Sequence, residues 1–187
     1  MPENFSRYTD EQLFAAFKMS GKEKDAAFRE LFARYERKVY LFCLRMSGNP
    51  EDANDIFQET FTRFYKQTQK DNEQVSNILA YLMTSARNVF LNSRRNKVYW
   101  SPFEDEKIAS NAPTYERTEL LNMISSALDL LDVSYREAFV LRFYQGLSYK
   151  EISEITGDSV SSLKVRVMRA KDQIRTILSP YISDLIR

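Results

Sequence analysis

Apolar residues recur at intervals of three and four along most of this chain, a spacing that predicts helices rather than strands. The sequence contains only four glycines, and a helix often ends where a glycine can adopt a positive φ. The pattern therefore predicts an all-α fold. The expected helices cover residues 10–19, 23–46, 50–67, 76–96, 115–131 and 134–145, followed by a helix pair between Leu147 and Ile177.

Short polar motifs mark where several of these helices begin. Thr9 with Gln12, and Ser148 with Glu151, have the spacing of a capping box, in which each side chain bonds the other residue's backbone N–H. Pro50 follows an asparagine, and proline suits the first helical position because its missing N–H would be unpaired there. These motifs predict helix starts at three places.

The periodicity is lost between residues 98 and 114, in a segment that contains two prolines and several acids. Such a segment is typical of a linker. We therefore expect two helical domains, residues 1–97 and 115–187, joined by this linker. Trp100 and Phe103 are unusual in a free linker, so part of it is expected to pack on a domain.

The segment from Leu147 to Ile177 has the pattern of a helix–turn–helix, with Gly157 at the turn. The inward positions of its second helix are apolar and the outward ones are mostly small, polar or basic. Such a helix can enter a DNA major groove, where cations meet phosphates and other side chains meet base edges. The alternative is a surface helix pair whose charges are only solvated. The candidate contacts are Ser161, Ser162, Lys164, Val165, Arg166 and Arg169.

Acidic residues gather on one side of the helix expected at 50–67. Asp52, Asp55 and Glu59 are spaced three and four apart, with Gln58 beside them. Like charges at this spacing repel one another. Acids near a helix start can complement its dipole, but Glu59 lies two turns in. A basic protein partner explains this face better.

The helix expected at 76–96 combines aromatic, amide and basic side chains. Tyr81, Arg87, Asn88 and Arg94 remain available after its apolar side is assigned inward, and Arg95 and Lys97 extend the basic end. This mixture suits single-stranded nucleic acid, in which bases stack and phosphates are neutralised. The alternative is a solvated basic helix end that interacts with its own dipole.

Composition narrows the function further. The chain has no histidine and one cysteine, Cys43, which excludes an internal disulfide and leaves no conventional zinc site, so no cofactor is expected. We find no apolar run of membrane-spanning length and no signal peptide, and therefore expect a cytoplasmic protein without membrane insertion. The net charge is only +1, but acids and bases are segregated into blocks, which indicates separate surfaces for separate partners.

Together these features resemble a bacterial RNA polymerase sigma factor of the extracytoplasmic-function (ECF) group, which retains only regions 2 and 4. Residues 52–61 are similar to region 2.2, residues 80–88 to the start of regions 2.3 and 2.4, and residues 141–175 to region 4. The resemblance implies that the chain binds core RNA polymerase and promoter DNA, and that an anti-sigma factor regulates it.

Residue roles follow from the same resemblance. Asp52, Asp55, Gln58 and Glu59 would bind the clamp helices of the polymerase β′ subunit. The second helix of the helix–turn–helix, here called the reading helix, would contact the minus-thirty-five element as duplex. Two positions depart from the family: Thr84 lacks a common basic contact, and Val165 replaces a small polar residue. The residues implied for the single-stranded minus-ten element are Asn72, Tyr81, Arg87, Asn88 and Arg94.

Two other functions compete with this interpretation. A free-standing helix–turn–helix regulator would use the same reading helix without polymerase, but it has no need of the acidic helix. A recombinase-like enzyme is disfavoured because the chain has no histidine and no clustered carboxylate and nucleophile set. We also expect a closed form of the free protein, in which linker residues Glu104, Asp105 and Glu106 shield part of the basic DNA-binding surface.

Overall fold

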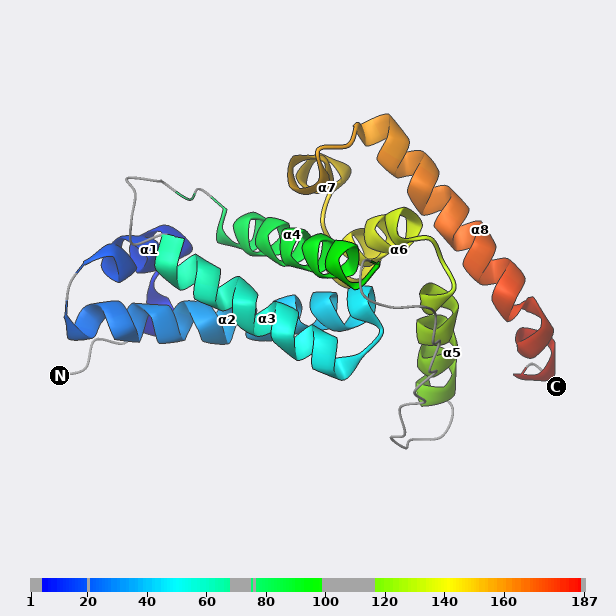
Figure 1. The fold of residues 1–187 in the computed structure, drawn as a ribbon, viewed down its shortest axis with the longest axis horizontal. Coiled ribbons are helices and arrows are strands. Elements are labelled where there is room, and N and C mark those ends of the chain that lie inside the picture. Colours follow the sequence, from blue (N-terminus) through cyan, green and yellow to red (C-terminus); the bar gives the residue numbers. More distant parts are fainter. Residues whose placement is uncertain (1–4, 20, 68–74, 76, 99–116, 186–187) are drawn as a thin grey trace.

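The computed structural model describes residues 5–19, 21–67, 75, 77–98 and 117–185. Every regular element in these ranges is helical, as the apolar periodicity predicts. Figure 1 shows the N-terminal half as a bundle of long helices. Its elements are η1 (Phe5–Arg7), α1 (Asp10–Lys18), α2 (Lys22–Ser47), α3 (Pro50–Gln67) and α4 (Ile78–Val98).

Aromatic side chains form much of the core of this bundle. Phe17 of α1 and Phe64 of α3 are fully buried and stack with their ring centroids 5.7 Å apart. Phe28 of α2 lies against both rings, and Leu82 of α4 is fully buried in the same core. Burying large aromatic rings contributes strongly to stability because each removes a wide apolar area from water.

The C-terminal half contains the helix–turn–helix and the helices that support it. Its elements are α5 (Arg117–Asp129), α6 (Val133–Phe139), a π-helical segment η2 (Val140–Tyr144), α7 (Tyr149–Thr156) and α8 (Val160–Leu185). One continuous helix was predicted over 134–145, but its last turn is wider, and Gln145 N donates to Val140 O at 3.1 Å. Helix α8 packs on α5, α6 and α7.

Helix starts agree with the capping motifs. Both capping boxes form: Gln12 N donates to Thr9 Oγ1, and Ser148 N donates to Glu151 Oε2 at 2.8 Å. The Asn49 side chain accepts from the backbone N–H of Glu51 at 2.7 Å. The start of α4 differs from the prediction of residue 76 because the side chain of Asn77 accepts from Ala80 N and caps the helix two residues later.

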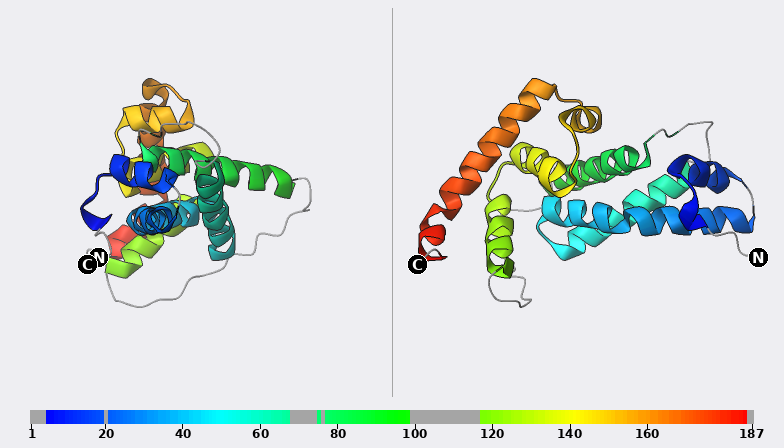
Figure 2. Two further views of the ribbon diagram at one scale, coloured as in Figure 1. Left: turned by 90° about the vertical axis from the view of Figure 1, so that its left-hand side faces the viewer. Right: turned by 180° about the vertical axis from the view of Figure 1, so that it is seen from behind.

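The two halves dock against one another (Figures 1 and 2). Their buried side chains form one continuous core. Helix α4 lies against α7, while α2 contacts α5, α6 and η2. The predicted linker, residues 98–114, lies outside the described residues apart from the end of α4, and so do Trp100, Phe103 and the three shielding acids. Among the described helices, none is both long and apolar enough to cross a membrane.

Candidate protein and nucleic-acid interfaces

The acidic side of α3 faces solvent at three of its four predicted positions. Asp55, Gln58 and Glu59 are exposed, whereas Asp52 is half-buried. Asp52 lines a hollow of about 290 Å³ together with Arg94 and Arg136, at the junction of the two halves. Asp52 is therefore less accessible to a partner than the other three positions.

A basic residue that the sequence analysis missed moderates this face. Arg63 Nε donates to Glu59 Oε1 at 2.7 Å, one turn further along α3. Both side chains are exposed, so the pair is weak and a partner can replace it. The spacing of four residues between these two side chains was the signal that could have revealed the pair.

An aromatic groove of about 490 Å³ runs beside the acids, between α2 and α3. The ring centroids of Phe32 and Phe61 lie 4.7 Å apart, and Phe57 packs on both. Gln58 lines the same groove, so its apolar wall adjoins the polar face. An apolar groove beside exposed acids fits a partner helix that is basic on one side and apolar on the other.

Helix α4 presents the candidate single-strand residues unequally. Asn88 and Arg94 are exposed. Tyr81 is half-buried, and its ring lies 5.6 Å from that of Phe64, so part of its face is used in the core. Asn72 lies outside the described residues.

Arg87 is held by the C-terminal half. Its Nε donates to Glu137 Oε1 of α6 at 2.7 Å, and the side chains are 20% and 5% exposed. Burial raises the pKa of the Glu137 carboxyl, and the charge and hydrogen bond of Arg87 oppose that shift. Asp158 raises this pKa further and Arg166 lowers it.

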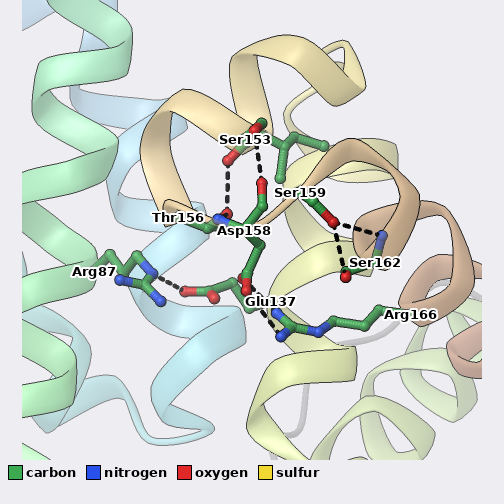
Figure 3. A network of polar contacts seen from close by, with 9 residues as sticks. Arg87, Glu137, Ser153, Thr156, Asp158, Ser159, Ser162 and Arg166 are labelled. Carbon is green, nitrogen blue, oxygen red and sulfur yellow. Dashed lines mark hydrogen bonds and ion pairs between the residues drawn. The ribbon is translucent and has the colours of Figure 1, made fainter.

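The turn between α7 and α8 is fixed by short-range bonds. Gly157 adopts φ 78°, a conformation that glycine reaches without strain. Ser153 Oγ donates to Asp158 O at 2.6 Å, and Asp158 N donates to Thr156 Oγ1 at 3.2 Å. Ser159 then caps α8 by accepting from Ser162 N at 3.2 Å. These bonds set the angle at which α8 leaves the turn (Figure 3).

Helix α8 has an apolar inner face and an open outer face. Leu163, Val167, Ala170 and Ile174 are buried. The exposed candidates are Ser161, Ser162, Lys164, Val165 and Arg169. The structure thus brings five of the six predicted duplex-contacting residues onto one open surface.

Two of the predicted cations also bond within the protein. Arg166 is half-buried and bonds both carboxylate oxygens of Asp158, one of them at 2.9 Å. Arg169 remains exposed, although its Nη1 donates to Tyr135 Oη at 3.2 Å. Arg166 therefore braces the turn, whereas Arg169 can turn outward at the loss of one exposed hydrogen bond.

Sequence reasoning missed a basic and aromatic hollow of about 360 Å³ beside the outer face. Lys164 Nζ lies 6.0 Å from the ring centroid of Tyr149, and Lys171 Nζ lies 5.9 Å from that of Phe143. Arg175 lines the same hollow one turn further on. Lysines 164 and 171 are seven residues apart, so two turns of α8 place them in one row.

Comparison with known proteins gives a consistent result. Residues 31–98 match the family "Sigma-70 region 2", and residues 121–174 match "Sigma-70, region 4". The chain is 31% identical over 163 residues to ECF RNA polymerase sigma factor SigE of Mycolicibacterium smegmatis; the match covers 83% of this chain and 63% of SigE. It is also 31% identical to RNA polymerase sigma factor CarQ of Myxococcus xanthus, over 86% of this chain and 94% of CarQ. The chain belongs to the ECF group of RNA polymerase sigma factors.

Solved structures show the same fold. This sigma factor superposes on RpoE of Bartonella quintana, determined in complex with the anti-sigma factor NepR, with a TM-score of 0.72 and 25% identity over 81% of this chain and 96% of that one. CnrH, determined with the cytosolic domain of CnrY, gives a TM-score of 0.69 at 22% identity over 91% and 97% of the two chains. The predicted all-α fold with regions 2 and 4 is confirmed.

Proposed function

We propose that this sigma factor divides its work among three surfaces. The acidic face of α3 binds core RNA polymerase, helix α4 contacts the minus-ten element as single strand, and helix α8 reads the minus-thirty-five element as duplex. The polymerase performs the chemistry in the cytoplasm, and the sigma factor itself is not an enzyme. The observation that carries this assignment is that Asp55 and Glu59 stay exposed on a chain that also has an open reading helix.

The polymerase surface combines charge and apolar area. Asp55, Gln58 and Glu59 supply an acidic edge, and the groove lined by Phe57 and Phe61 supplies an apolar floor. The β′ clamp helices are the expected partner, with basic side chains against the edge and apolar ones in the groove. Asp52 supports this surface from its half-buried position rather than forming its centre.

The reading helix uses its residues in two ways. Ser161, Ser162 and Arg169 reach base edges, and Val165 packs on a thymine methyl group. Lys164 meets phosphate, and Lys171 and Arg175 extend that row beyond the residues predicted from the sequence. Arg166 serves chiefly to hold the turn through Asp158.

A regulatory partner is part of the proposal. The RpoE structure from Bartonella quintana was determined with the anti-sigma factor NepR, and its fold matches this chain over most of both lengths. We therefore expect an anti-sigma factor to bind this chain and to compete with polymerase.

The acidic face distinguishes a sigma factor from a free-standing regulator. Asp55→Arg combined with Glu59→Arg should abolish co-purification with core polymerase, because both exposed side chains would then repel a basic partner. The matched control is Glu23→Arg with Glu36→Arg, which reverses two exposed acids on α2 and should leave co-purification intact. If the folded α3 variant still co-purifies with core polymerase, the proposed polymerase surface is wrong.

A further inference from the structure

Region 2 and region 4 are tied together by polar bonds that cross between them. Besides the Arg87–Glu137 pair, Arg136 Nη1 donates to Met46 O at 3.1 Å. Gln145 Nε2 donates to Lys38 O at 3.1 Å. Each bond joins the two halves at a specific pair of groups, so the two regions dock in one defined orientation.

We propose that the Arg87–Glu137 pair is an autoinhibitory latch, which holds region 4 on helix α4 and keeps Arg87 from promoter DNA. This inference rests on the proposed minus-ten role of α4. The Arg87 guanidinium donates its Nε–H to the carboxylate of Glu137, a region 4 residue whose side chain is only 5% exposed. A DNA phosphate near this arginine would have to compete with that carboxylate.

The latch specifies position more than it adds stability. Burial raises the pKa of Glu137 even though Arg87 contacts it, which means that desolvation outweighs the attraction between the two charges. Removing Arg87 alone leaves a buried carboxylate without its direct partner, and this is strongly unfavourable. The two regions therefore dock in the orientation that brings these two side chains together.

A second ion pair links the latch to the reading helix. Figure 3 shows the carboxylates of Glu137 and Asp158 lying between the guanidinium groups of Arg87 and Arg166. Arg166 bonds Asp158 directly, and both act on the pKa of Glu137. One charge cluster thus holds a minus-ten candidate at one end and a reading-helix residue at the other.

Promoter geometry requires the latch to open. The minus-ten and minus-thirty-five positions differ by roughly 25 base pairs. At about 3.4 Å per pair, this is about 85 Å along a duplex. Arg87 and Glu137 are in contact, so region 2 and region 4 cannot keep this pair and occupy both elements together. The latch is therefore a feature of the free protein, and it opens before the minus-ten strand is read.

Fluorescence transfer between the two halves tests the latch without DNA. Dyes are attached through Asn92→Cys on α4 and Gln173→Cys on α8, both exposed positions. The native Cys43 does not interfere, because burial raises the pKa of its thiol to about 12 and the reactive thiolate is scarce. Arg87→Glu should lower the transfer, and Arg87→Glu with Glu137→Arg should restore it. Equal transfer in all three folded proteins overturns the proposal.

Binding of a labelled dT12 single strand to the full chain tests whether the latch masks Arg87. Glu137→Lys should raise affinity by roughly three- to tenfold relative to Glu154→Lys, the effect of one freed charge-assisted contact. Glu154 is an exposed acid on α7, so the control makes the same charge change away from the pair. Circular dichroism verifies folding, and the Arg87→Glu transfer result stands independently if Glu137→Lys does not fold.

A further variant separates failure of the latch from failure of the proposed function. Equal affinities of the Glu137→Lys and Glu154→Lys proteins overturn the masking of Arg87. In the opened Glu137→Lys background, Arg87→Ala should remove the gain in affinity. If the gain persists, Arg87 does not contact the strand, and the proposed minus-ten role fails even though the transfer measurement supports a latch.

Discussion

At the scale of single residues, Glu137 gives the docked protein an unusual pH dependence. Its pKa is raised above the ordinary 4.5 by burial, so the folded state binds a proton more tightly than the unfolded state. Stability contributed by this group is complete below the unfolded pKa and is lost as the pH rises through the raised folded value. Ionised Glu137 therefore weakens the fold at neutral pH relative to an uncharged equivalent.

Glu137→Gln isolates this effect. The amide keeps an acceptor for Arg87 but does not ionise, so the variant should lack this part of the pH dependence. We expect the melting temperature of the wild type to fall relative to that of the variant as the pH is raised from about 4.5 through the weakly acidic range. Thermal unfolding followed by circular dichroism measures the difference at each pH. Parallel curves for the two proteins would contradict the raised pKa.

At the scale of elements, the turn of the helix–turn–helix depends on the pair between Asp158 and Arg166. Both side chains are about three-quarters buried, so each needs the other as partner. Asp158→Ala and Arg166→Ala should each lower the free energy of unfolding by about 1 kcal/mol, and the double variant by less than their sum. Urea unfolding measures all three. As a control, Asp172→Ala breaks an exposed ion pair on the same helix and should change the free energy of unfolding by less than about 0.5 kcal/mol. If the effects of Asp158→Ala and Arg166→Ala are additive in the double variant, the two side chains are not coupled.

On the outer face of α8, base reading and phosphate binding are proposed for different residues. Arg169→Ala should cost about 1–3 kcal/mol on the cognate minus-thirty-five duplex and little on others, because a base contact is sequence-dependent. Lys164→Ala should weaken binding to all duplexes alike and lower the salt slope by about one unit. Fluorescence anisotropy at several salt concentrations distinguishes the two. If neither variant loses affinity for a selected promoter, α8 does not read DNA.

Helices were predictable because their signals are local. The capping box of Ser148 and Glu151 lies within four residues, and the structure contains it. The π-helical turn at η2 was not predictable, because the sequence period does not mark it. Tyr144 and Gln145 at its end contact α2, which no local signal shows. Local signals therefore located the elements, while tertiary contacts set the details within them.

At the candidate sites, the sequence predicted whether a side chain is exposed more reliably than whether it is paired with another side chain of the protein. Spacing correctly placed Asp55 and Glu59 outward on α3. Arg87 and Glu137 are 50 residues apart, and no period in the sequence relates them. The pairing of Arg87 with an internal acid is visible only in the docked structure.

At the scale of the whole molecule, docking holds Arg87 of the proposed minus-ten surface and leaves the proposed minus-thirty-five surface open. Arg87 is held at the junction, whereas Ser161, Lys164 and Arg169 face solvent in the same structure. The closed protein should therefore bind a minus-thirty-five duplex as well as an opened one does, while it binds single strand less well. Opening of the chain should therefore change single-strand binding and leave duplex binding unchanged.

The prediction of equal duplex binding is tested with two variants of equal charge: Arg87→Glu as the opened protein and Arg37→Glu as the closed one. Arg37 is an exposed residue on α2, so its reversal matches the loss of positive charge without touching the latch. Anisotropy with the minus-thirty-five duplex should give dissociation constants within about twofold of each other, because exposed surface charges far from the contact act weakly. A much higher duplex affinity of the opened protein would show that region 2 also obstructs α8, and that docking closes both DNA-binding surfaces rather than one.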